Sequence, residues 1–253
     1  TPEDLDLKGI DTVAVDIETY DPNLKTKGLG AIRNDGFICG IAVATEKDTA
    51  YFPLQHSDTD IDPERINKIW DVLNEKIFYF VNITKVFHNA MYDVCWIRSM
   101  GLKIQGKIVD TMIAGSLVDE NRFRYDLGSL GRDYLGKGKN EAILTETAKE
   151  WGIDPKSEMY KLPAMYVGEY AERDAEMTLQ LWEEMKKEIY SQDIEDIFKL
   201  ETELFPCLVD MRFLGVRVDV EGAHKLKENL LAQEKECLQK IKNHKLQGPF
   251  WPP

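Results

Sequence analysis

Hydrophobic and polar positions alternate near the start of the chain and then fall into short apolar runs. In residues 11–18, Val13, Val15 and Ile17 alternate with small or polar residues, which is the period of a strand with one buried face. A polar, glycine-containing stretch at residues 20–35 predicts a loop. Further apolar segments predict strands at 37–44, 49–54, 85–87 and 107–109.

Helical spacing alternates with these strands along the chain. Asp62 followed by Pro63 has the pattern of an N-cap and a first helical residue, ahead of apolar positions on one helix face. Similar patterns predict helices at about 90–100, 111–119, 126–135, 141–151 and 166–189. This alternation predicts an α/β fold in three layers, with a mixed sheet flanked by helices.

The pattern changes near Ser191. Apolar residues between 194 and 208 have the spacing of a new amphipathic helix, and Pro206 predicts a kink in it or the start of a second helix. A short extended link at 215–219 and a long helix rich in Lys and Glu at 221–246 are expected to follow.

The same change predicts a domain boundary. We expect residues 1–190 to form the α/β domain and residues 191–253 to form a small helical segment. The tail at 247–253 follows no pattern that predicts a structure.

Composition and charge limit the class of protein. A hydrophobic content of 43% and a charged content of 30% are typical of globular domains. There is no apolar run of the ~18 residues that a membrane helix needs, and the first residues lack the pattern of a secretion signal. The net charge of −13 argues against a broad basic DNA-binding surface. A local acidic site that collects cations remains compatible with an enzyme acting on nucleic acid.

The cysteines are widely separated and include no Cys-x-x-Cys pair. This spacing predicts buried free thiols in a reducing compartment, and neither a zinc site nor a disulfide framework. The residues concerned are Cys39, Cys95, Cys207 and Cys237.

The first candidate motif is Asp16-Ile17-Glu18 in the first predicted strand. Side chains of a strand alternate between its two faces, so Asp16 and Glu18 point to the same side. Two neighbouring carboxylates repel each other, and a divalent cation that bridges them relieves the repulsion. The alternative is a solvated acidic pair on the surface.

The second candidate motif follows a short predicted strand. His88-Asn89 lead into a helix that Gly101 would end, and Asp93 falls in the first helical turn. The helix dipole favours a negative charge there, so Asp93 could also be present only for helix stability.

The third candidate motif is Tyr170-Ala171-Glu172-Arg173-Asp174 in a predicted helix. Tyr170 and Asp174 are four residues apart and therefore share a helix face, where a phenol beside a carboxylate could hydrogen-bond an attacking water. The alternative is a tyrosine that packs its ring beside a solvated aspartate.

Together the motifs resemble the proofreading 3′→5′ exonuclease domain of family A, DNA polymerase I-type, DNA polymerases, in the tyrosine subclass of the DEDD superfamily. Asp110-Thr111-Met112 and residues 125–130 resemble family segments between the motifs, and the resemblance runs from about residue 10 to about residue 245. It implies a ribonuclease H-like fold. The matching residues are Asp16 and Glu18 in the first motif, Asn89, Tyr92 and Asp93 in the second, and Tyr170 and Asp174 in the third.

The resemblance also implies two divalent metal ions, Mg²⁺ or Mn²⁺, for which oxygen-only ligands are suited. Asp16, Glu18 and Asp174 would bind one ion, and Asp16 with Asp93, through water, would bind the other. Two such ions usually lie about 3.5–4 Å apart, one activating water and one stabilising the leaving oxygen.

The remaining motif residues are expected to handle water and substrate. Tyr170 would orient the attacking water, and Asn89 and Tyr92 would position the terminal nucleotide. Leu29 and Phe87 are candidates for stacking against that nucleotide.

The expected substrate is a single-stranded or frayed DNA 3′ end, cleaved to 5′-mononucleotides, in the cytoplasm of a bacterial cell or phage-infected host. Glu201-x-x-Leu204 and residues 215–219 resemble the entry to the polymerase thumb, so the rest of a polymerase is an expected partner. The acidic motifs of a polymerase palm are absent from this sequence, and we therefore expect no polymerase activity from it. We also expect the chain to be a monomer.

Three alternatives remain open from the residues. A ribonuclease D-like RNA exonuclease has the same four acids and tyrosine. A free-standing repair nuclease would have indistinguishable motifs. A non-catalytic scaffold would normally lack one of the acids, and all four are present here.

Overall fold

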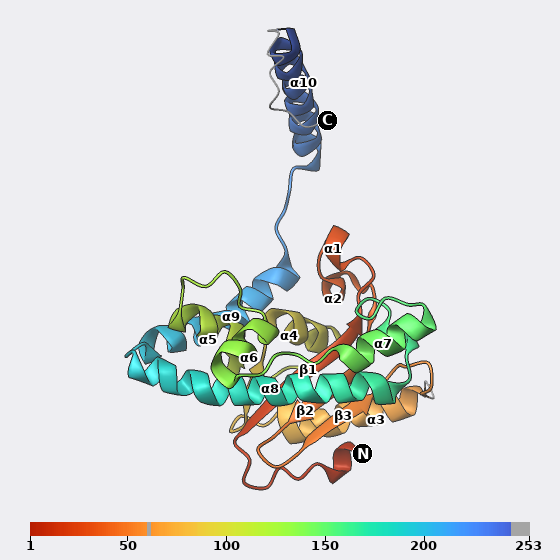
Figure 1. Ribbon diagram of the computed structural model, residues 1–253, viewed down its shortest axis with the longest axis vertical. Helices are drawn as coiled ribbons and strands as arrows, with labels where there is room; N and C mark the ends of the chain where they lie inside the picture. Colours follow the sequence, from red (N-terminus) through yellow and green to blue (C-terminus); the bar gives the residue numbers. More distant parts are fainter. Residues whose placement is uncertain (60–61, 244–253) are drawn as a thin grey trace. The chain divides into compact units, whose positions relative to one another are not determined.

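The protein was analysed as a computed structural model that describes residues 1–59 and 62–243. In these ranges the strands form one five-stranded sheet in the order β3-β2-β1-β4-β5 (Figure 1). β1 pairs antiparallel with β2 and β2 with β3, whereas β4 is parallel to both β1 and β5. The predicted mixed sheet is therefore confirmed. The strands are β1 (Thr12–Tyr20), β2 (Phe37–Ala44), β3 (Thr49–Pro53), β4 (Thr84–Phe87) and β5 (Ile108–Asp110).

The predicted helices are also present. They are α3 (Pro63–Leu73), α4 (Ala90–Ser99), α5 (Thr111–Val118), α6 (Leu127–Leu135), α7 (Ala142–Trp151), α8 (Ala164–Ser191), α9 (Glu195–Leu214) and α10 (Val220–Asn243). Pro206 lies inside α9, so the prediction that it could start a second helix is wrong. Short helical turns at Pro2–Asp4, Asn74–Phe78 and Met159–Lys161 were not predicted.

The two faces of the sheet differ in the size of their side chains. Val13, Val15 and Ile17 of β1 belong to a core with α3 and α4. The opposite face presents Ala14, with Ala42 and Ala44 of β2, to α5, α6 and α8. Figure 1 shows α8 running across the sheet on this side, in contact with β1 to β4. Small side chains allow close packing of a helix on a sheet, so the alanine face brings α8 close to β1.

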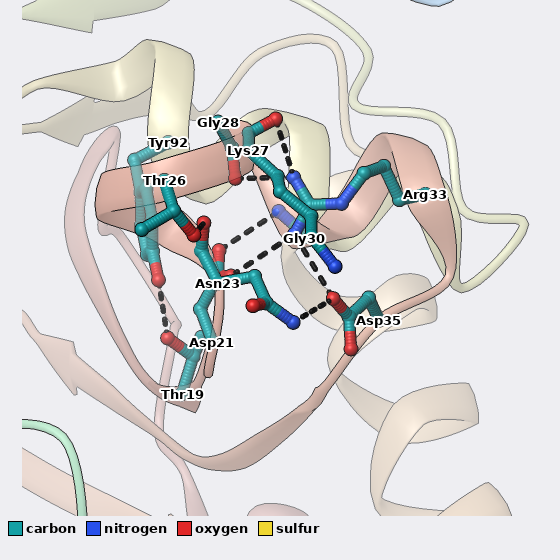
Figure 2. A network of polar contacts seen from close by, with 10 residues as sticks. All are labelled: Thr19, Asp21, Asn23, Thr26, Lys27, Gly28, Gly30, Arg33, Asp35 and Tyr92. Atoms are coloured by element: carbon teal, nitrogen blue, oxygen red, sulfur yellow. Dashed lines mark hydrogen bonds and ion pairs between the residues drawn. The ribbon is translucent and has the colours of Figure 1, made fainter.

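Residues 20–35 contain two short helices where a loop was predicted, α1 (Leu24–Lys27) and α2 (Gly30–Arg33). Side-chain hydrogen bonds hold them (Figure 2): Asp21 accepts the Gly30 N–H at 2.8 Å, and Asn23 donates to Asp35 at 2.8 Å. A Cβ at Gly30 would lie 2.2 Å from the Asp35 carbonyl oxygen, so only glycine fits. Four residues are too few to show helical periodicity, which explains the wrong prediction.

Helix α9 packs on the α/β unit. Phe198 stacks on Trp182 of α8 with ring centroids 5.3 Å apart, and Phe205 and Val209 are buried in the α3–α4 core. The first compact unit accordingly extends from Thr1 to Phe213. The boundary predicted between residues 190 and 191 falls inside this unit, and as a division between an exonuclease domain and a polymerase region it stays a prediction.

The second unit begins at Leu214, and its described part contains α10. Residues 215–219 lie outside helices and strands, with Gly215 at φ 72°, and the Asp219 side chain accepts the Gly222 N–H at 2.9 Å at the start of the helix. The predicted end of this helix at residue 246 and the tail at 247–253 lie outside the described residues.

The cysteines differ in their exposure to solvent. Cys39 and Cys95 are buried free thiols, but Cys207 and Cys237 are exposed, so the prediction of burial is wrong for these two. Cys207 lies in α9 and Cys237 in α10, which contains no buried residue. In the part of the chain that the structure describes, no helix is both long and apolar enough to span a bilayer.

Candidate active site

Asp16 and Glu18 lie on the face of β1 that is covered by α8. Asp16 is opposite Ala42 of β2, and Glu18 is opposite Gly40. The Glu18 side chain is buried at 8% exposure, so the alternative of a solvated surface pair does not describe it. A register shift follows directly between Glu18 and Thr19, where the strand leaves regular pairing. The period of two places both carboxylates on one side of β1, as predicted, and this side faces α8.

Asp93 lies in the first turn of α4 and is bound to the backbone of β1. Its Oδ1 accepts the Ile17 N–H at 3.1 Å. Pairing of β1 with β4 ends at Ala14, so this N–H has no partner in the neighbouring strand. The carboxylate satisfies a buried donor between Asp16 and Glu18 and is thereby fixed beside the first motif.

Asp110 positions this second motif, a role that we did not predict. One carboxylate oxygen accepts the N–H groups of Asn89 and Met112 at 2.9 and 2.8 Å, and the other accepts that of Ala90 at 2.8 Å. Asn89 has φ 63°, in the left-handed region. Asp110 thus caps both α4 and α5. Its place immediately before a predicted helix was a usable signal for the cap of α5, whereas the cap of α4 depends on the pairing of β4 with β5.

The predicted substrate-binding residues have different environments. The Tyr92 hydroxyl is hydrogen-bonded to the Thr19 hydroxyl, at the edge of the polar network of residues 19–35 in Figure 2. Burial raises the pKa of Tyr92 to about 12, so its hydroxyl is protonated. Phe87 is fully buried in the core and is therefore wrong as a stacking candidate, and Leu29 is 8% exposed.

Helix α8 brings the third motif to the sheet. Ala171 is fully buried on the alanine face, and Asp174 has a side chain that is 4% exposed. Glu172 accepts the Tyr51 N–H of edge strand β3 at 2.8 Å and so attaches the helix to the sheet. Tyr170 and Asp174 share one helix face, as their spacing predicted, and the alternative of a solvated aspartate does not hold.

A lysine that we did not predict contacts the third motif. Lys139, between α6 and α7, forms an ion pair with Asp174, and its Nζ donates to the Tyr170 hydroxyl at 3.2 Å. The sequence Gly136-Lys-Gly-Lys139 indicated only a loop. The only feature of the sequence that could have suggested a role for Lys139 is its position in a glycine-containing loop, and this feature does not indicate that Asp174 is its partner.

The carboxylates raise each other's pKa. Burial, followed by the charge of Asp174, raises the pKa of Asp16 to about 7. Burial and the neighbouring Asp16 charge raise the pKa of Glu18 and of Asp93 well above the usual range. Burial also raises the pKa of Asp174, against the opposing effect of Lys139. Four acids that disfavour each other's ionised forms are the arrangement expected where positive charge is to be bound.

The donor chemistry fits a hard divalent cation, because each of these acids offers only oxygen. Within residues 1–59 and 62–243, however, no three His, Cys, Asp or Glu side chains are gathered as a ready-made ion site. The Lys139 ammonium paired with Asp174 is close enough to oppose the raised pKa of Asp16 and Glu18. Lys139 therefore supplies a positive charge next to these acids.

Comparisons with known proteins identify the family of this chain. A family model described as 3′-5′ exonuclease matches residues 5–190. A DNA-directed DNA polymerase of Pseudomonas phage M6 is 31% identical over 260 residues, which cover 97% of this chain and 38% of that protein. The chain therefore spans well under half the length of this curated relative.

Solved structures share the fold at low identity. Brucella melitensis NrnC with bound Mg²⁺ superposes with a TM-score of 0.60 at 18% identity, covering 85% of this chain and 92% of that one. The POL domain of Pol1 from M. smegmatis, in complex with DNA primer-template and dNTP, gives a TM-score of 0.58 at 16% identity over 88% of this chain and 32% of that one. The predicted ribonuclease H-like α/β fold is confirmed by these neighbours.

Proposed function

Because this chain belongs to the 3′-5′ exonuclease family found in type A DNA polymerases, we propose that it removes nucleotides singly from the 3′ end of DNA and proofreads for a polymerase. The relative from Pseudomonas phage M6 is named a DNA-directed DNA polymerase. The resemblance of residues 201–219 to the entry of a polymerase thumb supports the proposal that this exonuclease works together with a polymerase region. The host would be a bacterial cell or a phage-infected one.

One observation carries the proposal. Asp16, Glu18, Asp93 and Asp174 come from β1, α4 and α8, yet they are close together: beyond the effect of burial, the charge of Asp174 raises the pKa of Asp16 and Glu18, and that of Asp16 raises the pKa of Glu18 and Asp93. Mutually repelling carboxylates are costly to bury, and a site that keeps them is expected to use them for binding cations.

We assign Asp16, Glu18, Asp93 and Asp174 as ligands of two divalent cations, Mg²⁺ or Mn²⁺. When bound, such ions supply Lewis acidity, which lowers the pKa of water and offsets negative charge on the phosphate and leaving oxygen. Asp93 is fixed by the Ile17 N–H, which holds one carboxylate oxygen in place.

The uncharged residues would position the reactants. The Tyr170 oxygen accepts a hydrogen bond from Lys139, and the hydroxyl is also within hydrogen-bonding reach of the Asp174 carboxylate, so it would orient the attacking water beside that carboxylate. Asn89, in its strained backbone conformation at the start of α4, and Tyr92, held by Thr19, would position the terminal nucleotide.

The test is degradation of 5′-labelled single-stranded DNA with Mg²⁺ or Mn²⁺. We expect stepwise shortening from the 3′ end and release of 5′-mononucleotides, with no reaction in EDTA. Asp16→Ala or Asp174→Ala should lower the rate by at least ~10³-fold. Shortening from the 5′ end, or full activity in EDTA, would contradict the proposal. A matched RNA oligonucleotide tests the ribonuclease D-like alternative, which predicts faster cleavage of RNA.

A further inference from the structure

The loop between α6 and α7 brings Lys139 into the acidic site by a defined path. Gly136 ends α6 with φ 67°, in the left-handed region that favours glycine. The aliphatic part of Lys139 then passes Gly128 of α6, where a Cβ would lie 3.5 Å from Lys139 Cγ. Its side chain is only 26% exposed. The fold therefore directs this side chain inward, unlike a lysine that extends into solvent.

The Lys139 ammonium has two partners, and both belong to the third motif. It is ion-paired with Oδ2 of Asp174 and donates to the Tyr170 hydroxyl at 3.2 Å. Nζ also lies 5.3 Å from the centroid of the Tyr170 ring. Removing one partner of a buried ion pair leaves the other charge uncompensated, so this contact is expected to affect how the site holds Asp174.

We propose that Lys139 competes with a divalent cation for the Asp174 carboxylate. Lys139 is then a tethered counter-ion, which keeps Asp174 and Tyr170 together and sets the cation concentration at which the site becomes active. The ammonium blocks one Asp174 oxygen, and its charge repels a dication nearby. This inference rests on the proposed function, in which Asp174 is a metal ligand. Lys139 is a positioning residue, because it acts through Asp174 and Tyr170.

The experiment measures Mn²⁺ binding to the full chain by electron paramagnetic resonance, without substrate. Lys139→Met removes the charge and keeps a side chain of similar length, whereas Lys139→Arg keeps the charge. Lys137→Met is the matched control from the same loop, since Lys137 has no side-chain hydrogen bond or ion pair within the described residues. Competition between two cations for one carboxylate is a coupling free energy, for which effects of about five-fold or more are usual.

We expect Lys139→Met to bind Mn²⁺ about five-fold more tightly than the native chain or more, and both Lys139→Arg and Lys137→Met to stay within about two-fold of it. In thermal unfolding, Lys139→Met should melt lower in EDTA and gain more from Mn²⁺ than the native chain does. If Lys139→Met does not fold, Lys139→Gln replaces it in both measurements.

Equal Mn²⁺ affinity of folded Lys139→Met, or of Lys139→Gln in its place, and Lys137→Met would overturn the competition, and so would weaker binding by Lys139→Met. A native chain that binds no Mn²⁺ and shows no metal-dependent cleavage would instead contradict the proposed function. The two failures are therefore distinguishable.

Discussion

The hydroxyl of Tyr170 can be removed from the third motif by substitution with Phe, which leaves the aromatic ring in place. Tyr170→Phe keeps the ring, which packs against the cluster that contains Leu144 and Ala148 of α7, and deletes the contact with Lys139. If the phenol orients the attacking water, we expect the single-turnover rate to fall about ten- to a hundred-fold, equivalent to roughly 1.5–3 kcal/mol, with little change in affinity for the 3′ end. Single-turnover conditions prevent product release from hiding the chemical step.

A packing role for Tyr170 predicts the opposite result, because Phe fills the same space. A Tyr170→Phe variant that cleaves at the native single-turnover rate would exclude the assignment. Tyr190→Phe is a suitable control, since Tyr190 is 78% exposed near the end of α8.

The raised pKa of Asp16 predicts how the metal-free protein responds to pH. Its folded value of about 7 lies above the ~3.9 of an aspartate in an unfolded chain. Between these values the folded state retains a proton that the unfolded state has released, so this contribution to stability is lost as pH rises from about 4 through about 7. In EDTA, we expect the melting temperature to fall over this range and to fall less in Asp16→Asn.

Thermal unfolding in EDTA from pH 5 to pH 8.5 measures this effect. The exposed Asp71→Asn is the control for the loss of one charge. If Asp16→Asn and Asp71→Asn have the same pH dependence, the Asp16 carboxylate is not held in its protonated form by the fold.

One side chain, that of Asp110, caps the N-terminal ends of both α4 and α5. Asp110 accepts three backbone N–H groups from the two helices. Loss of one N-cap usually costs about 0.5–2 kcal/mol, so we expect Asp110→Ala to lose about 2 kcal/mol or more in urea unfolding and to lower activity by displacing Asp93. Asp62→Ala is the matched control, because among the described residues the Asp62 side chain accepts only the Glu64 N–H, at the exposed start of α3. An equal or smaller loss for Asp110→Ala would contradict the double cap.

The same elements indicate what can be predicted from sequence. The alternation of Val13, Val15 and Ile17 predicted β1 and also the common face of Asp16 and Glu18, because both follow from local periodicity. Helix α8 was predicted from its composition, with the spacing of Tyr170 and Asp174. Contacts within one strand or helix depend on a few neighbouring residues, and their pattern is therefore visible in the chain.

Contacts between distant segments are not visible in this way. Lys139 and Asp174 are 35 residues apart, and Ile17 and Asp93 are 76 apart. The pairing of these residues depends on the order of strands and on how closely α8 packs. The burial of Phe87 was missed for the same reason, since it follows from packing with distant residues in the core that contains α3 and α4.

The extent of the first unit leads to a prediction for the whole molecule. A chain of residues 1–213 keeps α9, with Phe198, Phe205 and Val209 buried, whereas a chain of residues 1–190 loses all three. Each such side chain contributes about 1.5–3 kcal/mol. We expect residues 1–213 to unfold in urea at nearly the same midpoint as residues 1–253, and residues 1–190 to be less stable by several kcal/mol or not to fold.

If residues 1–190 are as stable as residues 1–213, α9 is not part of the folding unit. In that case the division predicted after residue 190 would also be the structural one. Urea midpoints of the three chains, measured side by side, decide between the two.

The alanine face of the sheet affects how inactive relatives could be recognised. Ala14, Ala42 and Ala44 lie beneath α8, and none of them belongs to a motif. A larger side chain at one of these positions would push α8 away from β1, and Asp174 would move with it while every acidic residue remained in the sequence. A relative with intact motifs could therefore have lost its activity through one bulky residue in the sheet. Sequence comparison at the positions of Ala14, Ala42 and Ala44, together with the four acids, would identify such proteins.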